Sequence, residues 1–135
     1  MICLDTNVVI ILLKRQMSSV RDRFRAEQAR KTPVAVSALV LHELWYGVSK
    51  SGQSGANEER IREFLAGPVS ILDFNHDDGR EAGHIRAYLE KRGTPIGPYD
   101  ILIAAQARRR DALLVTANER EFNRVPRLRT ENWAR

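Results

Sequence analysis

Four separate segments of this sequence carry acidic or amide side chains that the predicted elements would direct to one region. Asp5 directly follows the first apolar run, and Glu43 lies about one and a half turns into the helix predicted after the second. Asp100 lies in the first turn of a mostly apolar helix, and Asn118 and Glu121 follow the fourth apolar run. Because the carboxyl ends of parallel strands meet at one edge of a sheet, we expect these groups to gather there.

Each acidic residue also has an ordinary structural explanation. Asp100 could complement the positive end of its helix, Asp5 could cap the helix that follows it, and Glu43 could face solvent. Together these explanations fail, because carboxylates gathered at a partly enclosed edge repel one another unless a cation lies between them. With a single cysteine and no suitable histidine pair in the sequence, hard oxygen ligands favour Mg²⁺ or Mn²⁺ over zinc.

Apolar and amphipathic segments alternate along the chain and predict the elements that would position these side chains. Short apolar runs predict strands at residues 2–4, 33–36, 69–72 and 113–115, with 127–130 as a candidate fifth strand. Amphipathic or capped segments predict helices at 8–13, from Ser18 or Ser19 onward, and at 37–48, 58–65, 77–91, 99–109 and 118–122. The segment 49–57, rich in Ser and Gly, is predicted to be a loop.

This order of elements predicts an α/β protein. Strands that alternate with helices form a mainly parallel sheet, here of four to five strands, covered by helices on both faces through right-handed crossovers. The length of 135 residues suits one domain, so we expect residues 1–135 to form a single three-layer α/β/α unit.

The chain is basic, and its positive charge is concentrated in two segments. Its 22 Lys and Arg exceed its 17 Asp and Glu, which gives a formal net charge of +5. The excess lies in residues 14–31 and 108–135, whereas the rest of the chain is slightly acidic. An anionic partner such as a nucleic acid would explain this pattern, and solvated helix faces are the alternative. The run Arg108–Arg110 could contact phosphates or complement the end of its own helix.

Cysteine content and hydropathy indicate a cytoplasmic protein. Cys3 is the only cysteine, so the chain has neither an internal disulfide framework nor a cysteine-rich zinc site. The longest apolar run, 8–13, is too short to cross a bilayer, and Asp5 stands where a secretory signal would carry positive charge. We therefore expect no membrane association.

A divalent ion held by carboxylates in a basic protein suggests phosphodiester hydrolysis. Such an ion can polarise a phosphoryl oxygen and lower the pKa of an attacking water molecule. Basic segments would then hold the backbone of a nucleic acid.

Five segments of the chain together resemble the PIN-domain ribonucleases, and more narrowly the VapC toxins of bacterial toxin–antitoxin pairs. They are LDTN (4–7), SALVLHELWYG (37–47), PIGPYDILIAAQAR (95–108), LVTANEREF (114–122) and VPRLRTENW (125–133). The resemblance implies a PIN-like fold and an endoribonuclease that depends on Mg²⁺ or Mn²⁺ and cuts structured RNA, often tRNA. It also implies a homodimer that a cognate antitoxin holds inactive.

The resemblance also assigns roles to individual residues. Asp5, Glu43 and Asp100 match the three acidic positions of the family's metal site. A second set of residues matches polar positions that support the site, by hydrogen bonding to its carboxylates: Asn7, Ser37 and Thr116.

The fourth acidic position departs from the commonest family pattern. Many relatives place Asp soon after the Thr of the fourth strand, but this chain has Asn118 there and Glu121 about one helical turn further on. A neutral amide can ligate through its carbonyl oxygen but brings no charge. We favour Glu121 as the missing carboxylate and assign Asn118 to a cap or a water contact, with Asn118 as ligand the alternative.

The remaining histidines and aromatic residues are interpreted mainly as structural. His42 adjoins Glu43 but points about 100° away around the helix, so it is expected to face elsewhere. His76 and His84 lack neighbours at metal-binding spacing. The helix that carries Trp45 and Tyr46 has enough other apolar residues for its core, so at least one of the two is expected to be exposed at an interface.

Two other functions fit parts of the pattern. A phosphatase could attack through Asp5 and form an aspartyl-phosphate, although such enzymes need an acid two residues later, where this chain has Asn7. A noncatalytic module could bind RNA or a partner protein through its basic surface and its aromatic residues.

Overall fold

A five-stranded parallel sheet forms the centre of the computed structural model, which describes residues 1–52 and 54–134. Its strands lie in the order β3-β2-β1-β4-β5, and every neighbouring pair is parallel. The predicted α/β class and parallel sheet are therefore confirmed. The strands are β1 (Ile2–Leu4), β2 (Val34–Ser37), β3 (Val69–Leu72), β4 (Leu113–Val115) and β5 (Arg129–Glu131).

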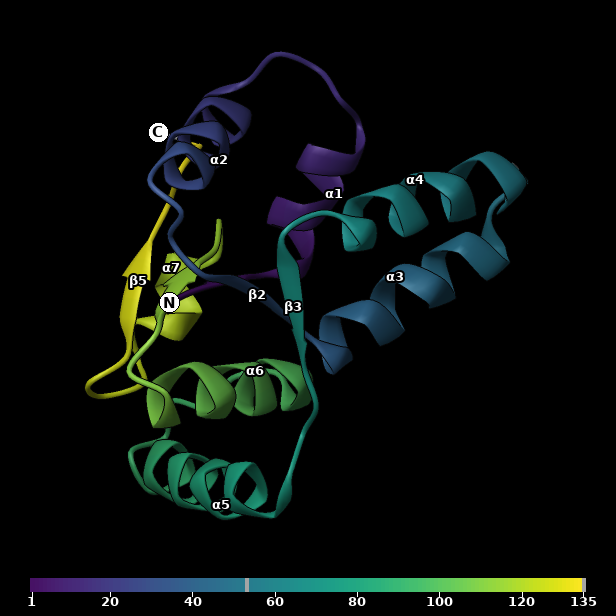
Figure 1. Ribbon diagram of the computed structural model, residues 1–135. Coiled ribbons are helices and arrows are strands. Elements are labelled where there is room, and N and C mark those ends of the chain that lie inside the picture. Colours follow the sequence, from purple (N-terminus) through teal and green to yellow (C-terminus); the bar gives the residue numbers. More distant parts are fainter. Residues whose placement is uncertain (53, 135) are drawn as a thin grey trace.

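Helices cover both faces of this sheet (Figure 1). The connections from β1 to β3 and from β3 to β4 run in opposite directions across the sheet, so right-handed crossovers place α1–α4 on one face and α5 and α6 on the other. The helices of the described residues are α1 (Thr6–Leu13), α2 (Ser19–Ala29), α3 (Ala38–Lys50), α4 (Ser54–Ala66), α5 (His76–Lys91), α6 (Pro98–Arg109) and α7 (Glu119–Phe122).

The strand order reverses beside β1, the central strand. β2 and β3 lie on one side of β1, whereas β4 and β5 lie on the other. All residues of β1 and β2 are buried, which explains their continuous apolar sequence. The register pairs Leu4 with both Val36 and Val115, so these three strands end at the same level. In sheets of this kind, ligands bind at such a reversal, beyond the carboxyl ends of the strands.

Polar caps fix where several helices begin. The side chain of Ser18 accepts a hydrogen bond from the backbone of Arg21, and that of Ser37 accepts one from Leu39. Helix α1 starts two residues earlier than predicted because Asp5 caps it.

The predicted loop at 49–57 is wrong for most of its length. Helix α3 continues to Lys50 and α4 begins at Ser54; Gln53, which belongs to the same predicted loop, lies outside the described residues. Asn57 donates a side-chain hydrogen bond to Ser51, and Ile61 is buried one turn further along α4. Tertiary packing therefore extends the helix through a segment whose Ser and Gly residues have low helix propensity.

Cys3 is a free thiol within β1, and burial raises its pKa to about 11. None of the described helices is both long and apolar enough to cross a lipid bilayer.

A cluster of ion pairs binds α5 to α6. Asp78 is fully buried in the first turn of α5, where its Oδ1 accepts hydrogen bonds of 2.8 Å from both Arg109 and Arg110. Arg108 pairs with Glu81 at 2.7 Å. The basic run at the end of α6 thus serves the structure, and its guanidinium groups are committed to α5 rather than presented to phosphates.

Ionisation of Asp78 depends on this arginine pair. Burial opposes the charged carboxylate, but hydrogen bonds from Arg110, Arg109 and the backbone of Asn75 outweigh it and lower the pKa of Asp78 to about 2. Because this pKa lies below the unfolded value of about 3.9, Asp78 stabilises the fold above that value, and the stabilisation is lost as the pH falls toward 2.

We predict that Asp78→Asn lowers the free energy of unfolding at pH 7 by about 2–3 kcal/mol, because it leaves two partly buried guanidinium groups without their carboxylate. Urea denaturation of wild type and variant measures the difference, which should shrink near pH 2. Asp77→Asn, the same change at the exposed neighbouring position, is the control. Equal effects of the two substitutions would contradict the role given to the ion pairs.

Candidate active site

Asp5 lies at the carboxyl end of β1, and both of its carboxylate oxygens are held. Its Oδ1 accepts a 2.8 Å hydrogen bond from the backbone N–H of Thr6, and its Oδ2 accepts one of 2.8 Å from the hydroxyl of Thr116. Asp5 is only 6% exposed, and Thr116 is fully buried at the end of β4. Strands on the two sides of the reversal therefore fix the orientation of this carboxylate.

Thr6 connects Asp5 with Glu43. Its hydroxyl donates a 3.0 Å hydrogen bond to Oε1 of Glu43, so the side chain of Glu43 leans from α3 back toward the end of β1. Thr6 was not among the residues predicted from the sequence to form the site. The available signal was its position between Asp5 and Asn7 at a strand end, but only the fold shows which acid its hydroxyl meets.

Asp100 and Glu121 form a second pair at the same edge. Their carboxyl groups share a hydrogen bond, although they come from α6 and α7. The Asn118 side chain donates a 3.0 Å hydrogen bond to Oε2 of Glu121, and its backbone N–H donates to Oγ1 of Thr116 at 2.9 Å. Asn118 takes the position before α7, but its side chain holds Glu121 instead of capping the helix.

Electrostatic coupling joins the two pairs into one acidic group, defined here as Asp5, Glu43, Asp100 and Glu121. The pKa of Asp100 is raised to about 7, first by burial, then by its hydrogen bond with Glu121, and then by the negative charges of the other three residues. Burial and the neighbouring carboxylates therefore both oppose ionisation of Asp100 at this edge.

The chemistry of the acidic group suits a hard divalent cation. The atoms that it offers to a metal ion are all carboxylate oxygens, because the group contains no His or Cys. Within 1–52 and 54–134, no three His, Cys, Asp or Glu side chains are arranged as they would be around a metal ion. Each member instead interacts with protein groups: Asp5 with Thr6 and Thr116, Glu43 with Thr6, and Asp100 with Glu121.

The three residues predicted to support the site lie in different environments. Thr116 donates to Asp5, as described above. The hydroxyl of Ser37 accepts from Leu39 at the start of α3 and so fixes the helix that carries Glu43. Asn7 is exposed in the first turn of α1.

A hollow of about 570 Å³ opens beside the acidic group, and we call it the aromatic hollow. His42 contributes to it, with its ring 5.6 Å from that of Tyr99. His42 was expected to face elsewhere than Glu43; the two side chains diverge around α3, but both line this hollow. The lining residues are Thr6, Asn7, Ile10, His42, Glu43, Tyr46 and Tyr99.

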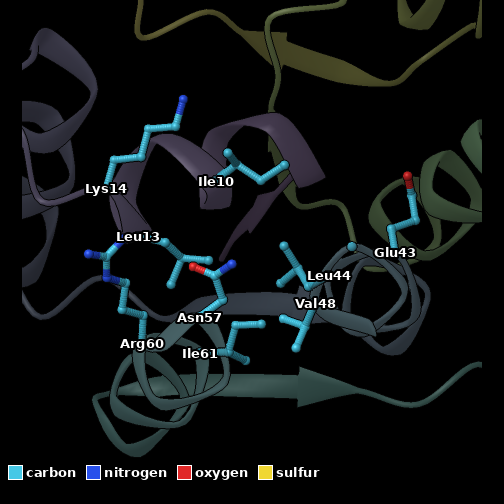
Figure 2. A pocket seen from close by; sticks show the side chains of 10 residues that line it. Ile10, Leu13, Lys14, Glu43, Leu44, Val48, Asn57, Arg60 and Ile61 are labelled. Carbon is cyan, nitrogen blue, oxygen red and sulfur yellow. The ribbon is translucent and has the colours of Figure 1, made fainter. Parts of the chain in front are cut away.

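A second hollow, about 250 Å³ and mostly apolar, lies between α1, α3 and α4 (Figure 2). Glu43 lies at one end of it, and Lys14 and Arg60 lie at the other. We call it the apolar hollow. It shares Ile10 and Glu43 with the aromatic hollow, and its lining is completed by Leu13, Leu44, Gly47, Val48, Asn57 and Ile61.

Comparison with known proteins assigns this arrangement to a family. The profile of the PIN domain matches residues 2–128. The chain belongs to the PIN-domain family. Its relatives include the tRNA(fMet)-specific endonuclease VapC of Shigella flexneri, which is 40% identical over 131 residues that cover 97% of this chain and 96% of the relative. Ribonuclease VapC2 of Haemophilus influenzae is 42% identical over 130 residues, 96% of each chain.

Solved structures of relatives share the fold of this PIN domain. VapBC2 from Rickettsia felis, bound to a DNA fragment from its promoter, superposes with a TM-score of 0.90 at 37% identity and covers 98% of this chain and 99% of that one. DNA-bound VapBC from Salmonella typhimurium gives a TM-score of 0.88 at 37% identity, with 98% and 97% covered. Ribonucleases of the PIN family generally depend on a divalent metal ion, and the acidic group is the part of this PIN domain whose chemistry suits one.

We predict that Asp100→Asn stabilises the protein in the absence of divalent ions. Because the pKa of Asp100 in the fold, about 7, exceeds the unfolded value, the ionised carboxyl costs stability above pH 7 and nothing below pH 4. After allowance for solvent screening at this partly exposed group, the gain at pH 8 should be about 1–2 kcal/mol.

Urea denaturation in EDTA at pH 4 and pH 8 measures this gain. Asp111→Asn removes the same charge from a side chain that is 90% exposed and should have no comparable effect. If Asp100→Asn instead destabilises the protein at pH 8, the ionised carboxyl of Asp100 does not cost the fold stability, and the prediction is wrong.

Proposed function

We propose that this PIN domain is a metal-dependent endoribonuclease and the toxin of a toxin–antitoxin pair. The observation that carries the proposal is the convergence of Asp5, Glu43, Asp100 and Glu121 at the carboxyl edge of the sheet, where Thr6, Thr116 and Asn118 hold three of the four carboxylates. Relatives that are named VapC ribonucleases, and that match this chain along nearly their whole length, support it.

The bound ion is Mg²⁺ or Mn²⁺, held by Asp5, Glu43, Asp100 and Glu121. All-oxygen donor sets favour these hard cations. When bound, the ion supplies the Lewis acid that polarises a phosphoryl oxygen and lowers the pKa of the attacking water.

The neighbouring polar residues orient the four carboxylates for this task. Thr6 and Thr116 hold Asp5 through both of its oxygens, and Thr6 also holds Glu43. Asn118 holds Glu121, which gives this amide a positioning role in place of the carboxylate found in many relatives. The reaction is an in-line attack of water on an RNA phosphodiester, which leaves 5′-phosphate and 3′-hydroxyl ends.

The substrate is a structured RNA, and tRNA is the specific candidate. The Shigella flexneri relative is named for tRNA(fMet). Exposed basic residues on and around α2 supply positive charge for the phosphate backbone: Lys14, Arg25, Arg30 and Lys31. An RNA substrate and a lone reduced cysteine both fit a cytoplasmic protein.

The second partner is the cognate antitoxin, which binds in the apolar hollow. The complexes of the Rickettsia felis and Salmonella typhimurium relatives support such a partner. The apolar hollow ends at Glu43, so a segment bound there would lie against the acidic group. The functional unit is a homodimer.

The aspartyl-phosphate phosphatase is disfavoured. Such enzymes need an acid two residues after the nucleophilic aspartate to protonate the leaving group. Position 7 is an exposed amide, Asn7, and not an acid. If the protein is instead a noncatalytic binding module, replacing Asp5 will not change any RNA cleavage that is observed.

We predict that Asp5→Asn and Asp100→Asn each lower the rate of RNA cleavage by at least about 100-fold, because each removes a charged ligand. The assay follows cleavage of total tRNA by gel, with EDTA abolishing the activity and Mg²⁺ or Mn²⁺ restoring it. Asp111→Asn serves as the matched control. Cleavage at the wild-type rate by either variant would show that the activity does not arise from this site.

We also predict that Gly47→Gln weakens antitoxin binding without unfolding the protein. A Cβ at Gly47 meets no atom within 4 Å, so a longer side chain fits α3 but occupies the apolar hollow. The affinity should fall at least about 10-fold, the effect expected of overfilling a packed contact.

The control for this experiment is Gly83→Gln, which is equally unhindered but lies on α5. Binding is measured by calorimetry with the product of the adjacent open reading frame. If the Gly47→Gln protein binds the antitoxin with unchanged affinity, the apolar hollow is not part of the antitoxin interface.

A further inference from the structure

Two of the three tyrosines of the chain line the aromatic hollow and are largely exposed. Tyr46 is 60% exposed and Tyr99 is 47% exposed. A single exposed ring is ordinary, but two exposed rings that line one hollow present a larger apolar surface, of the kind that marks binding sites.

The same helices carry these tyrosines and the acidic group. Tyr46 lies three residues after Glu43 on α3, so the two side chains share one face of the helix. Tyr99 directly precedes Asp100 at the start of α6. The rings thus keep a fixed position relative to the carboxylates.

Neighbouring side chains hold both rings in place. The ammonium group of Lys50 lies 5.0 Å from the ring centroid of Tyr46. The imidazole of His42 lies 5.6 Å from the ring of Tyr99, tilted by 46°. A surface of this kind loses little conformational entropy when a flat ligand stacks on it.

We infer that the aromatic hollow binds a nucleobase that adjoins the scissile phosphate and stacks on Tyr46 or Tyr99. This inference rests on the proposed function. The hollow shares Thr6 and Glu43 with the acidic site, so an RNA phosphate held at the carboxylates would bring an attached base to the hollow. Unpaired RNA bases bind in this way, stacked on tyrosine or histidine rings and hydrogen-bonded at their edges, for which Asn7 is in place.

This assignment specifies the substrate further. A base inserted into the hollow cannot remain paired within a duplex, so the enzyme cuts where a nucleotide is already unstacked, in a loop or a single strand. Stacking accepts any base, so this contact selects RNA structure more than sequence.

The test uses a single-stranded RNA oligonucleotide whose cleavage position is mapped first. Tyr46→Leu and Tyr99→Leu should raise KM by roughly 5- to 100-fold with a smaller change in kcat, the loss expected for one base–aromatic stack. Tyr46→Phe and Tyr99→Phe keep the ring and should restore the wild-type KM. Circular dichroism checks that the variants are folded.

Tyr88→Leu is the matched control. Tyr88 is 41% exposed on α5 and has Arg92 over its ring at 5.4 Å, but it does not line the aromatic hollow. Its loss should leave KM unchanged. An oligonucleotide with abasic sites on both sides of the cut supplies the second arm of the test. The wild-type KM for this oligonucleotide should be raised by the same roughly 5- to 100-fold. The leucine substitutions should raise that KM no further.

Three results would overturn the inference. The leucine variants could match Tyr88→Leu, or they could weaken cleavage of intact and abasic RNA equally. They could also change the oligomeric state or the antitoxin affinity while KM stays constant, which would assign the hollow to a protein interface. If wild type fails to cut RNA with Mg²⁺ or Mn²⁺, the proposed function itself fails, whereas wild-type cleavage without tyrosine dependence rejects only the stacking contact.

Discussion

Mutual repulsion among carboxylates is the constraint on which this site depends. Four acidic side chains from four different connections meet at the carboxyl edge of one sheet, where burial first, and then the neighbouring carboxylates, raise the pKa of Asp100 to about 7. An arrangement that costs stability persists only where the surrounding fold holds it in place. Here the hydroxyls of Thr6 and Thr116 and the amide of Asn118 fix three of the four carboxylates. In the function proposed above, the same unfavourable charge is what gives the site its affinity for a divalent cation.

The topology explains how acids so distant in sequence come together. Strand order reverses beside β1, so Asp5 and the segment after β4 meet across the reversal. One helical layer supplies Glu43, and the opposite layer supplies Asp100. The buried ion pairs of Asp78 with Arg109 and Arg110 bind α5 to α6 and thereby help to hold the helix that carries Asp100. The basic run in the sequence thus contributes to the site through packing.

Much of this arrangement could be predicted from the sequence. Short apolar runs predicted the parallel sheet, and Asp5, Glu43 and Asp100 were expected at its carboxyl edge because each follows a recognisable element. Contacts between distant segments were not predictable: Thr6 meeting Glu43 and His42 reaching Tyr99 both depend on how helices pack. The false loop at 49–57 has the same origin, since burial of Ile61 stabilises a helix that local propensity disfavours.

The central claim is that the four carboxylates together hold one kind of cation at the end of β1. Diffraction from crystals soaked in Mn²⁺, recorded at a wavelength where manganese scatters anomalously, tests it directly. The account predicts an anomalous peak bonded to Asp5 and Asp100, with Glu43 and Glu121 in its immediate surroundings and ligand distances of about 2 Å. A fully occupied manganese ion elsewhere on the protein, with none at this edge, would contradict it.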